Sequence, residues 1–356
     1  MRRIGTLVGL LALLAGCSSA AEPGGPTGAT SSALAGGDED DTVQYTASQL
    51  LALNVRPIVI GHEGAGENFG SDPTKPINDT IDSVTLAYQQ GASVVEVDAE
   101  ITKDGQVVAY HDFDFLPDYT CINSYTLAEL QAKVPYIPTL DSVLKVARQF
   151  NHTSKTLSGI VVVEMKTRSP LCDPNDVQEQ PFVSAVVDVI HKTRMDDAVI
   201  LDGFSPALDY LALQMAPNIP RELDLDLLQL LTPAQVTGAT GLQVTLIQKQ
   251  LNLGLQWADL GVVYRLPGYT SVQQFFQTAF VVGASIIDGE QDFIVTSEQQ
   301  QPGSVAQFVG AAHAFGMKAF ADPAKNVQQF GYYASFGFDG AYCDDIPASL
   351  ALQPPL

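Results

Sequence analysis

The chain has 356 residues, of which 46% are hydrophobic and 16% are charged, and its formal net charge at pH 7 is −22. This composition is typical of a globular protein. The acidic excess excludes a basic nucleic-acid footprint and disfavours binding to anionic lipid headgroups through protein charge alone. It also means that the overall field repels an anionic substrate unless a bound cation reverses it locally.

The first sixteen residues have the features of an export signal. Arg2 and Arg3 give a positive start, and residues 4–14 form an apolar stretch of signal-peptide length that is too short to cross a bilayer comfortably. The segment LAGC at 14–17 resembles a bacterial lipobox, which implies that Cys17 is lipidated and anchors the chain to the cell envelope on its periplasmic or extracellular face. An ordinary secretory signal cut at another position is the alternative.

Residues 17–42 are rich in Ala, Gly, Ser, Pro and Thr and include an acidic run at 38–41. They show no hydrophobic periodicity, so we expect a disordered tether in which the acidic run is a solvated spacer. Residues 43–356 are then predicted to form one folded domain, whose length is ordinary for an α/β barrel.

The stretch from 58 to 112 carries the polar residues on which the functional prediction depends. Apolar runs at 58–60 and 107–110 lead directly to His62 and His111. Another apolar run carries Glu96 and Asp98, which point to the same face of a strand because they are two residues apart. Two histidines beside two aligned carboxylates indicate a hydrolytic metal site at the mouth of a parallel TIM (β/α)8 barrel.

The same stretch resembles the N-terminal signature of the glycerophosphodiester phosphodiesterases. The family pattern reads His-Arg-Gly, Glu-Asn-Thr, Gly-Ala-Asp/Ser with Glu-x-Asp, Thr-Lys-Asp and Val-Val-x-His-Asp. The matching segments are HEG at 62–64, NDT at 78–80, GASVVEVD at 91–98, TKDG at 102–105 and VVAYHD at 107–112. The segment FGFDGAYCDDIP at 336–347 is similar to the closing strand of the family. The resemblance implies a TIM barrel that acts on a small-molecule phosphodiester.

The apolar run at 160–163 leads to Glu164 and Lys166, which match the Glu-x-Lys strand of the family. The resemblance implies that Glu96, Asp98 and Glu164 hold a divalent cation, Ca²⁺ or Mg²⁺, both of which prefer oxygen ligands. It implies that Lys166 contacts the phosphate and that the two histidines are the acid–base pair. The predicted reaction is hydrolysis of glycerophosphodiesters to sn-glycerol 3-phosphate and an alcohol.

Two places depart from the family pattern, because NDT at 78–80 replaces Glu-Asn-Thr and Glu63 stands where the family has arginine. A guanidinium binds phosphate oxygens through paired hydrogen bonds, whereas a carboxylate repels them. Two like charges about 4 Å apart cost roughly 4 kcal/mol at an effective dielectric constant near 20. Glu63 can point away, join the metal shell, or bind a cationic substrate group. Two alternatives follow: a phospholipid or sphingomyelin phosphodiesterase of the same superfamily, and a non-catalytic lipoprotein that binds a phosphodiester.

Three cysteines follow Cys17. Cys121 and Cys172 lie in loop-like sequence of an exported chain and can form a disulfide, whereas Cys343 lies in an apolar run and is predicted to be buried and reduced. Between 226 and 300 the pattern is weak, and the aromatic residues Trp257, Tyr264 and Tyr269 either line a substrate site or belong to the core. Elsewhere the pattern predicts helices at 81–90, 139–150, 182–194, 208–215 and 305–315, and strands at 199–204, 219–225 and 317–322.

Overall fold

The computed structural model describes residues 42–111, 120–167, 172–173, 175, 177–230 and 268–354. Residues 1–41, with Cys17, and the aromatic residues Trp257 and Tyr264 lie outside these ranges. In the helices of the described ranges, no stretch is both long and apolar enough to cross a membrane.

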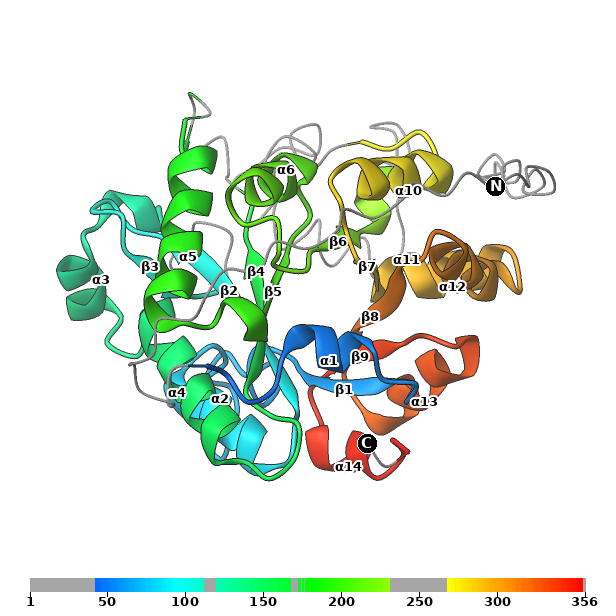
Figure 1. The fold of residues 1–356 in the computed structure, drawn as a ribbon, viewed down its shortest axis with the longest axis horizontal. Helices are drawn as coiled ribbons and strands as arrows, with labels where there is room; N and C mark the ends of the chain where they lie inside the picture. Colours follow the sequence, from blue (N-terminus) through cyan, green and yellow to red (C-terminus); the bar gives the residue numbers. More distant parts are fainter. Residues whose placement is uncertain are drawn as a thin grey trace, which may run out of the picture.

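The centre of the molecule is a ring of parallel strands, which confirms the predicted TIM barrel (Figure 1). The ring is joined between β5 and β6 by a single parallel bridge from Leu201 to Arg221, and the N–H of Asp224 donates to the Gly203 carbonyl at 3.2 Å. The strand order is β5-β4-β2-β1-β9-β8-β7-β6. The bounds are β1 (Ile58–Gly61), β2 (Val94–Ile101), β4 (Ile160–Met165), β5 (Val199–Asp202), β6 (Glu222–Leu225), β7 (Ile286–Glu290), β8 (Lys318–Ala324) and β9 (Gly340–Cys343).

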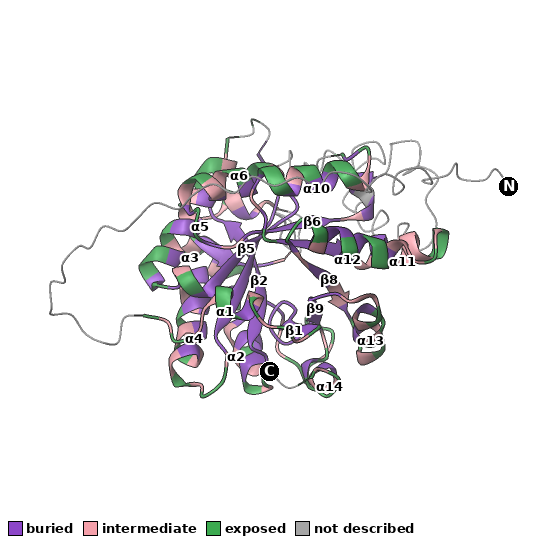
Figure 2. Cartoon of the chain, turned by 45° about the vertical axis from the view of Figure 1, so that its right-hand side comes forward, coloured by how far each residue is buried: buried purple, intermediate pink, exposed green. Residues whose placement is uncertain are grey.

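Helices surround the ring and bury its outer face, while their own outer faces are exposed (Figure 2). Several begin where a Thr side chain accepts the N–H of a residue in the first turn, as Thr80 and Thr139 do, which satisfies an otherwise unpaired donor. The bounds are α1 (Ala47–Leu51), α2 (Ile81–Gln89), α3 (Leu127–Lys133), α4 (Leu140–Thr153), α5 (Glu179–Thr193), α6 (Pro206–Met215), α10 (Val272–Val281), α11 (Gln291–Gln300), α12 (Ser304–Ala314), α13 (Val327–Phe336) and α14 (Ile346–Leu350), with 3-10 turns η1 (Ile122–Ser124), η2 (Asp196–Ala198) and η3 (Leu227–Leu230).

The two faces of the barrel strands have different roles. Outward residues such as Val97 and Val163 belong to the large core between strands and helices. Inward residues near the strand starts, such as Ile160 and Phe320, form a separate apolar cluster with Leu50 of α1. The barrel interior is therefore closed at the end where the strands begin, and polar inward residues occupy the opposite end.

The apolar run that leads to His111 is not a barrel strand. It forms β3 (Val107–Ala109), which pairs antiparallel with the far end of β2. Residues 94–111 therefore make a hairpin, and the chain returns toward the barrel mouth at His111. The sequence indicated an apolar run there but not its direction.

Asn151 near the end of α4 fixes the first described residues. Its side-chain oxygen accepts the N–H groups of Gln44 at 2.6 Å and Tyr45 at 3.1 Å. Its amide nitrogen donates to the carbonyls of Tyr45 at 2.8 Å and Ser158 at 3.1 Å. Ser158 lies two residues before β4, so these bonds lie at the end of the barrel where the strands begin.

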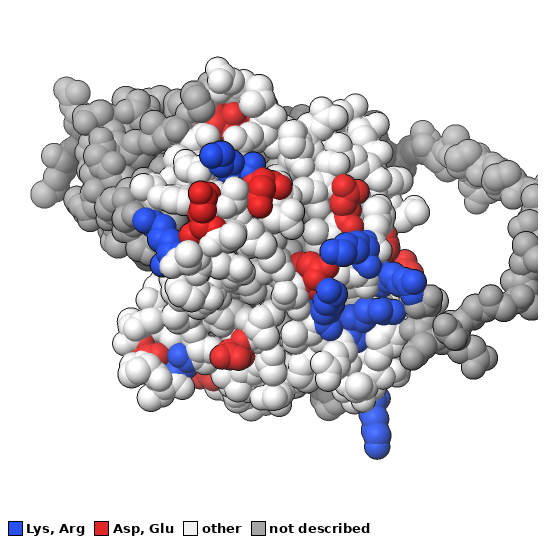
Figure 3. Space-filling model, turned by 90° about the vertical axis from the view of Figure 1, so that its left-hand side faces the viewer, with Lys and Arg blue, Asp and Glu red and all other residues white. Residues whose placement is uncertain are grey.

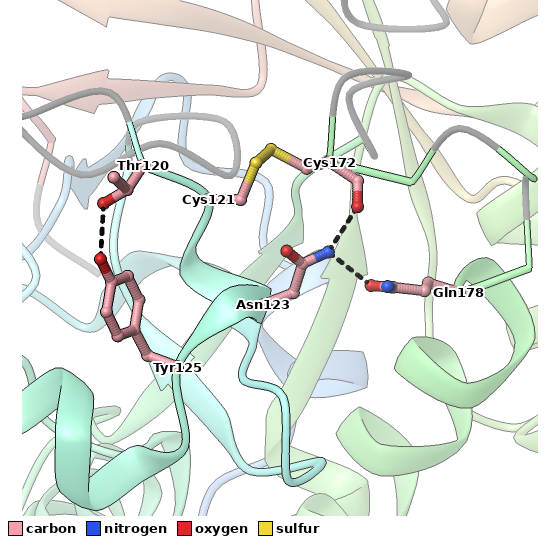
Figure 4. The surroundings of a disulfide bond; sticks show 6 residues. All are labelled: Thr120, Cys121, Asn123, Tyr125, Cys172 and Gln178. Carbon is pink, nitrogen blue, oxygen red and sulfur yellow. Dashed lines mark hydrogen bonds between the residues drawn. A yellow bond between two sulfur atoms is a disulfide. The ribbon is translucent and has the colours of Figure 1, made fainter.

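A disulfide joins Cys121 and Cys172, as the sequence allowed (Figure 4). The side chain of Asn123 donates to the Cys172 carbonyl at 2.9 Å and to the Gln178 side chain at 3.0 Å. Cys343 is buried and free, which confirms the prediction. The bridge therefore links the segment after β3 to the segment that follows β4.

Several cationic side chains gather at one place among the described residues. Lys145, Arg148, Lys192 and Arg194 line one surface hollow between α4 and α5, and Figure 3 shows Lys and Arg side chains gathered on the side of the molecule that carries these helices. The Asp141 carboxylate contacts Lys145 at 2.6 Å and Lys192 at 3.1 Å. The patch is thus partly neutralised.

Candidate active site

A row of carboxylates lies inside the barrel near the ends of neighbouring strands. Asp98 of β2 is in register with Glu164 of β4, which in turn is in register with Asp202 of β5. Paired residues of adjacent parallel strands point to the same face. Val97, Val163 and Leu201, each of which directly precedes one of these acidic residues, face the helices. Successive side chains of a strand point to opposite faces, so the three acidic side chains face the barrel interior.

Glu96, Asp98 and Glu164 come together as the sequence suggested. Their carboxylate oxygens lie within 4.8 Å of one another, and the residues are 3%, 1% and 8% exposed. Glu96 Oε1 and Asp98 Oδ2 are buried without a hydrogen-bond partner, which is costly for a charged group. A hard divalent cation would satisfy both oxygens, so the donor set fits Ca²⁺ or Mg²⁺.

Lys166 is held by two of these carboxylates. Its Nζ atom lies 2.6 Å from Asp98 Oδ1 and 2.7 Å from Glu164 Oε1, and the residue is 2% exposed. Burial opposes its charge, but the two carboxylates raise the pKa of Lys166 well above its ordinary value. Burial alone would raise the pKa of Asp98, but the Lys166 ammonium and the two histidines outweigh burial and bring that pKa to about 2. Lys166 therefore neutralises two carboxylates of the candidate cation site, and its contact with the phosphate stays a prediction.

His62 follows β1 and is oriented by an aspartate. Its Nδ1 lies 2.7 Å from Asp344 Oδ1, and its Nε2 lies 3.7 Å from Asp322 Oδ1 and 3.9 Å from Glu63 Oε1. Burial opposes protonation, but these three carboxylates together raise the pKa of His62 well above 6.5. The surroundings thus favour an imidazolium whose Nε2 faces the site.

Glu63 turns into the site. Its backbone has a positive φ of 47°, and its N–H donates to Glu96 Oε2 at 2.7 Å. Its carbonyl accepts the N–H of Asp79 at 3.0 Å. The side chain is 1% exposed, and its Oε1 lies 3.4 Å from Nε2 of His111. Glu63 therefore stands between the two histidines, and the option that it points away is wrong.

The barrel interior holds further acidic groups to which the sequence reasoning gave no role. Each occurs within or just after a short apolar run that forms a barrel strand, and that pattern was the available signal. The additional acidic residues are Asp202, Glu222, Asp224, Asp288, Glu290, Asp322 and Asp344.

The aromatic residue Tyr269 packs edge-on against Phe275 at a ring-centroid distance of 5.4 Å, so Tyr269 belongs to the core.

Solved structures share the fold. A glycerophosphoryl diester phosphodiesterase from Silicibacter pomeroyi, described as putative in its own name, is 15% identical, with a TM-score of 0.61 over 86% of this chain and 96% of that one. An Oleispira antarctica phosphodiesterase in complex with the product sn-glycerol-3-phosphate is 19% identical, with a TM-score of 0.54 over 83% of this chain and 96% of that one.

Curated relatives match over short stretches. A glycerophosphocholine phosphodiesterase of Eremothecium gossypii is 43% identical over 56 residues, which are 15% of this chain and 4% of that protein. Another from Candida albicans is 30% identical over 113 residues, which are 31% of this chain and 9% of that protein. The aligned part is therefore a small fraction of these relatives.

The match to a family is far longer. It runs over residues 62–348, from the first histidine of the site to the helix after the last barrel strand. It includes the carboxylates of β2 and β4 and the strands that position them. This chain therefore belongs to the glycerophosphoryl diester phosphodiesterase family.

Proposed function

We propose that the protein hydrolyses glycerophosphodiesters to sn-glycerol 3-phosphate and an alcohol in a reaction that depends on Ca²⁺ or Mg²⁺. The observation that carries the proposal is the convergence of two histidines beside the buried carboxylates of Glu96, Asp98 and Glu164. The family match supports it, as does the product bound in the Oleispira antarctica relative. The names of the curated relatives favour glycerophosphocholine as one substrate.

A phosphodiester requires charge neutralisation, activation of an attacking oxygen and protonation of the leaving alkoxide. Glu96, Asp98 and Glu164 would hold the cation, which when bound would supply charge neutralisation and favour deprotonation of the attacking oxygen. His62 is suited to act as the general acid, because three carboxylates favour its protonated form. His111 accepts the proton of the attacking water or substrate hydroxyl as its oxygen bonds to phosphorus, and His62 gives its proton to the leaving alcohol oxygen as that phosphorus–oxygen bond breaks. Where a substrate hydroxyl attacks first, water then opens the cyclic phosphate with the two histidine roles reversed.

Glu63 sets the charge of this pair. Its carboxylate offsets positive charge on both imidazoles, since Oε1 lies 3.4 Å from His111 and 3.9 Å from His62. Its other oxygen, Oε2, is buried without a hydrogen-bond partner. The arrangement removes the phosphate clamp of the family pattern and adds a negative charge that favours a substrate with a cationic headgroup, such as choline or ethanolamine.

The test is a panel of choline, ethanolamine and uncharged glycerophosphodiesters, each with Ca²⁺ or Mg²⁺, in which release of sn-glycerol 3-phosphate is measured. We expect a chelator to abolish release and His111→Ala to lower kcat by about a thousandfold. His191→Ala is the matched control, because His191 is half exposed and pairs with Asp196 on the surface. Full activity in His111→Ala would overturn the mechanism.

Two other outcomes would identify the alternatives. Hydrolysis of intact phospholipid or sphingomyelin without hydrolysis of deacylated diesters would mark a lipid phosphodiesterase. Binding of a diester without turnover, with every divalent cation tested, would mark a binding lipoprotein. Glu63 motivates the second outcome, because its carboxylate repels the phosphate.

We further propose that residues 1–16 are removed, that residues 17–42 form a tether and that a lipid on Cys17 anchors the exported protein to the bacterial cell envelope. The proposal is supported by the lipobox-like sequence and the acidic, apolar-poor segment that follows it. Cys17→Ser should move the protein from the membrane fraction to the soluble fraction, while Cys343→Ser should not. Retention of Cys17→Ser in the membrane fraction would contradict the lipid anchor.

A further inference from the structure

The carboxylates inside the barrel extend well beyond the first three. The row of Asp98, Glu164 and Asp202 continues on the next strands with Asp224 of β6 and Asp288 of β7, which are in register with each other. Carboxylate oxygens of Glu164, Asp202 and Asp224 lie within 4.8 Å of one another. Glu164 therefore belongs to two adjacent groups of three carboxylates.

A separate observation points to a ligand at the second group. Asp288 is 1% exposed, and neither of its carboxylate oxygens has a hydrogen-bond partner. Its register with Asp224 directs both side chains to the same face, and Ile287 beside it packs outward against the helices. Asp224, which is 4% exposed, also has a buried oxygen, Oδ1, without a partner. These carboxylate oxygens are therefore shielded from water and accept no hydrogen bond from the protein.

A single ammonium cannot balance the charge of both groups. Lys166 lies in ion-pair distance of Asp98 and of Glu164, the carboxylate that the two groups share. Asp202 Oδ1 accepts the N–H of Gly203 at 2.6 Å, but among the described residues no Lys or Arg side chain forms an ion pair with Asp202 or Asp224. Either protons or a cation must offset buried charge of this density.

We propose that Glu164, Asp202 and Asp224 hold a second divalent cation, with Glu164 shared between two cations and Asp288 beside the outer one. The inference rests on the proposed cation site of Glu96, Asp98 and Glu164, which it extends to a carboxylate-bridged pair. The ligands are all oxygen atoms, so the cation is a hard one of the Ca²⁺, Mg²⁺ or Mn²⁺ class. Two cations that share a carboxylate could stabilise the attacking and leaving oxygens of one displacement.

Binding of Mn²⁺ to the full chain tests this without reference to activity. The free ion is counted by electron paramagnetic resonance during a titration near pH 8, and the spectrum of the bound ion is then recorded. We expect two Mn²⁺ per chain, with broadening from the coupling of two neighbouring ions. Asp202→Asn combined with Asp224→Asn should bind one Mn²⁺ and lose the broadening, and Glu96→Gln should also lose it.

Asp209→Asn is the matched control. Asp209 is fully buried, and both of its carboxylate oxygens lack a partner, yet it lies on α6 and is in none of the groups of three. This variant should still bind two Mn²⁺. Circular dichroism checks the folding of every variant, and the single substitutions Asp202→Asn and Asp224→Asn replace the double one if it does not fold.

One Mn²⁺ per chain at saturation, or two in the Asp202→Asn, Asp224→Asn variant, would overturn the inference. Hydrolysis of a glycerophosphodiester by a protein that holds one Mn²⁺ would leave the proposed function intact and reject the second cation. Two bound Mn²⁺ without hydrolysis of any diester would support the second cation and reject the proposed function.

Discussion

Glu63 Oε1 lies 3.4 Å from Nε2 of His111, at the position in the sequence where the family has arginine. The same carboxylate is one of those that raise the pKa of His62. A single departure from the family pattern therefore acts on both members of the proposed acid–base pair.

Glu63→Gln should shift the pH profile. An acid must be protonated, so activity falls as pH rises through the pKa of His62. Removing one of the negative charges that raise this pKa should move the alkaline limb of kcat to lower pH by about one unit. The substitution should also lower KM severalfold for a substrate without a cationic headgroup. Glu67→Gln is the control, because Glu67 pairs with Lys325 at 3.0 Å near the surface. An unchanged alkaline limb in Glu63→Gln would argue against coupling to His62.

Glu63→Arg restores the family residue and probes phosphate binding. If the local surroundings accept the longer side chain, KM for uncharged diesters should fall about tenfold, since a bidentate clamp replaces a repulsive charge. For glycerophosphocholine the gain should be smaller, because the favourable contact with the cationic headgroup is lost. Equal changes for both substrates would show that Glu63 does not contribute to headgroup preference.

Asp344→Asn should lower kcat by about ten- to a hundredfold with little change in KM. Asp344 Oδ1 accepts from Nδ1 of His62 at 2.7 Å, which orients the ring and favours its charged form. Asp345→Asn is a close control, because the Asp345 side chain accepts the N–H of Ala348 at the start of α14. A larger loss in Asp345→Asn than in Asp344→Asn would indicate that the helix start, and not the His62 bond, matters.

The metal-free protein should lose stability as pH rises. Burial is the largest cause that raises the pKa of Glu164 from 4.5 to about 8 and that of Asp224 from 3.8 to about 7. Between pH 4 and 8 the folded chain therefore binds protons that the unfolded chain has released, so the free energy of unfolding falls across this window. In chelator, the Tm should be about 5–10 °C lower near pH 8 than near pH 5.

Saturating Ca²⁺ near pH 8 should reverse this loss, because a cation that binds the folded state replaces the protons. Melting followed by circular dichroism at several pH values, with and without Ca²⁺, measures both effects. The depressed pKa of Asp98 has the opposite sign but acts only below about pH 4. A Tm that rises with pH in chelator would contradict the prediction.

Replacing both Cys121 and Cys172 by Ser should destabilise the protein by about 4 kcal/mol, which is the loop-closure entropy for a bridge of this span. The two residues are 51 apart in the sequence. Denaturant unfolding with and without a reductant measures the effect, and Cys343→Ser in the buried apolar run is the comparison. Identical unfolding midpoints for the bridged and unbridged chains would show that the disulfide does not constrain the unfolded state.

The sequence predicted those features that depend on local pattern. Glu164 and Lys166 are two residues apart at the end of an apolar run, and β4 ends there. The helices α4 and α5 follow from apolar spacing, although α5 begins at Glu179, three residues before the predicted start. The histidines and the first three carboxylates were found because family motifs carry them.

Features that depend on the pairing of distant strands were not predicted. No local signal shows that β3 turns back along β2. Asp202 and Asp224 come together only because β5 meets β6, and Asp224 and Asp288 only because β6 and β7 pair in register. In the sequence, each of these residues is only an acidic group at the end of an apolar run. The inward turn of Glu63 depends on its positive φ and on the bond from its N–H to Glu96.

The anchoring of Gln44 and Tyr45 by Asn151 has a consequence for how the molecule presents itself. The chain departs from the domain next to the start of β4, whereas Glu164 lies near the other end of that strand. The proposed attachment and the proposed chemistry thus lie at opposite ends of the barrel, so we expect a protein that begins at residue 42 to retain its full turnover. If the proposed lipid anchor holds the chain at a bilayer, it does so from the end of the barrel opposite the carboxylates.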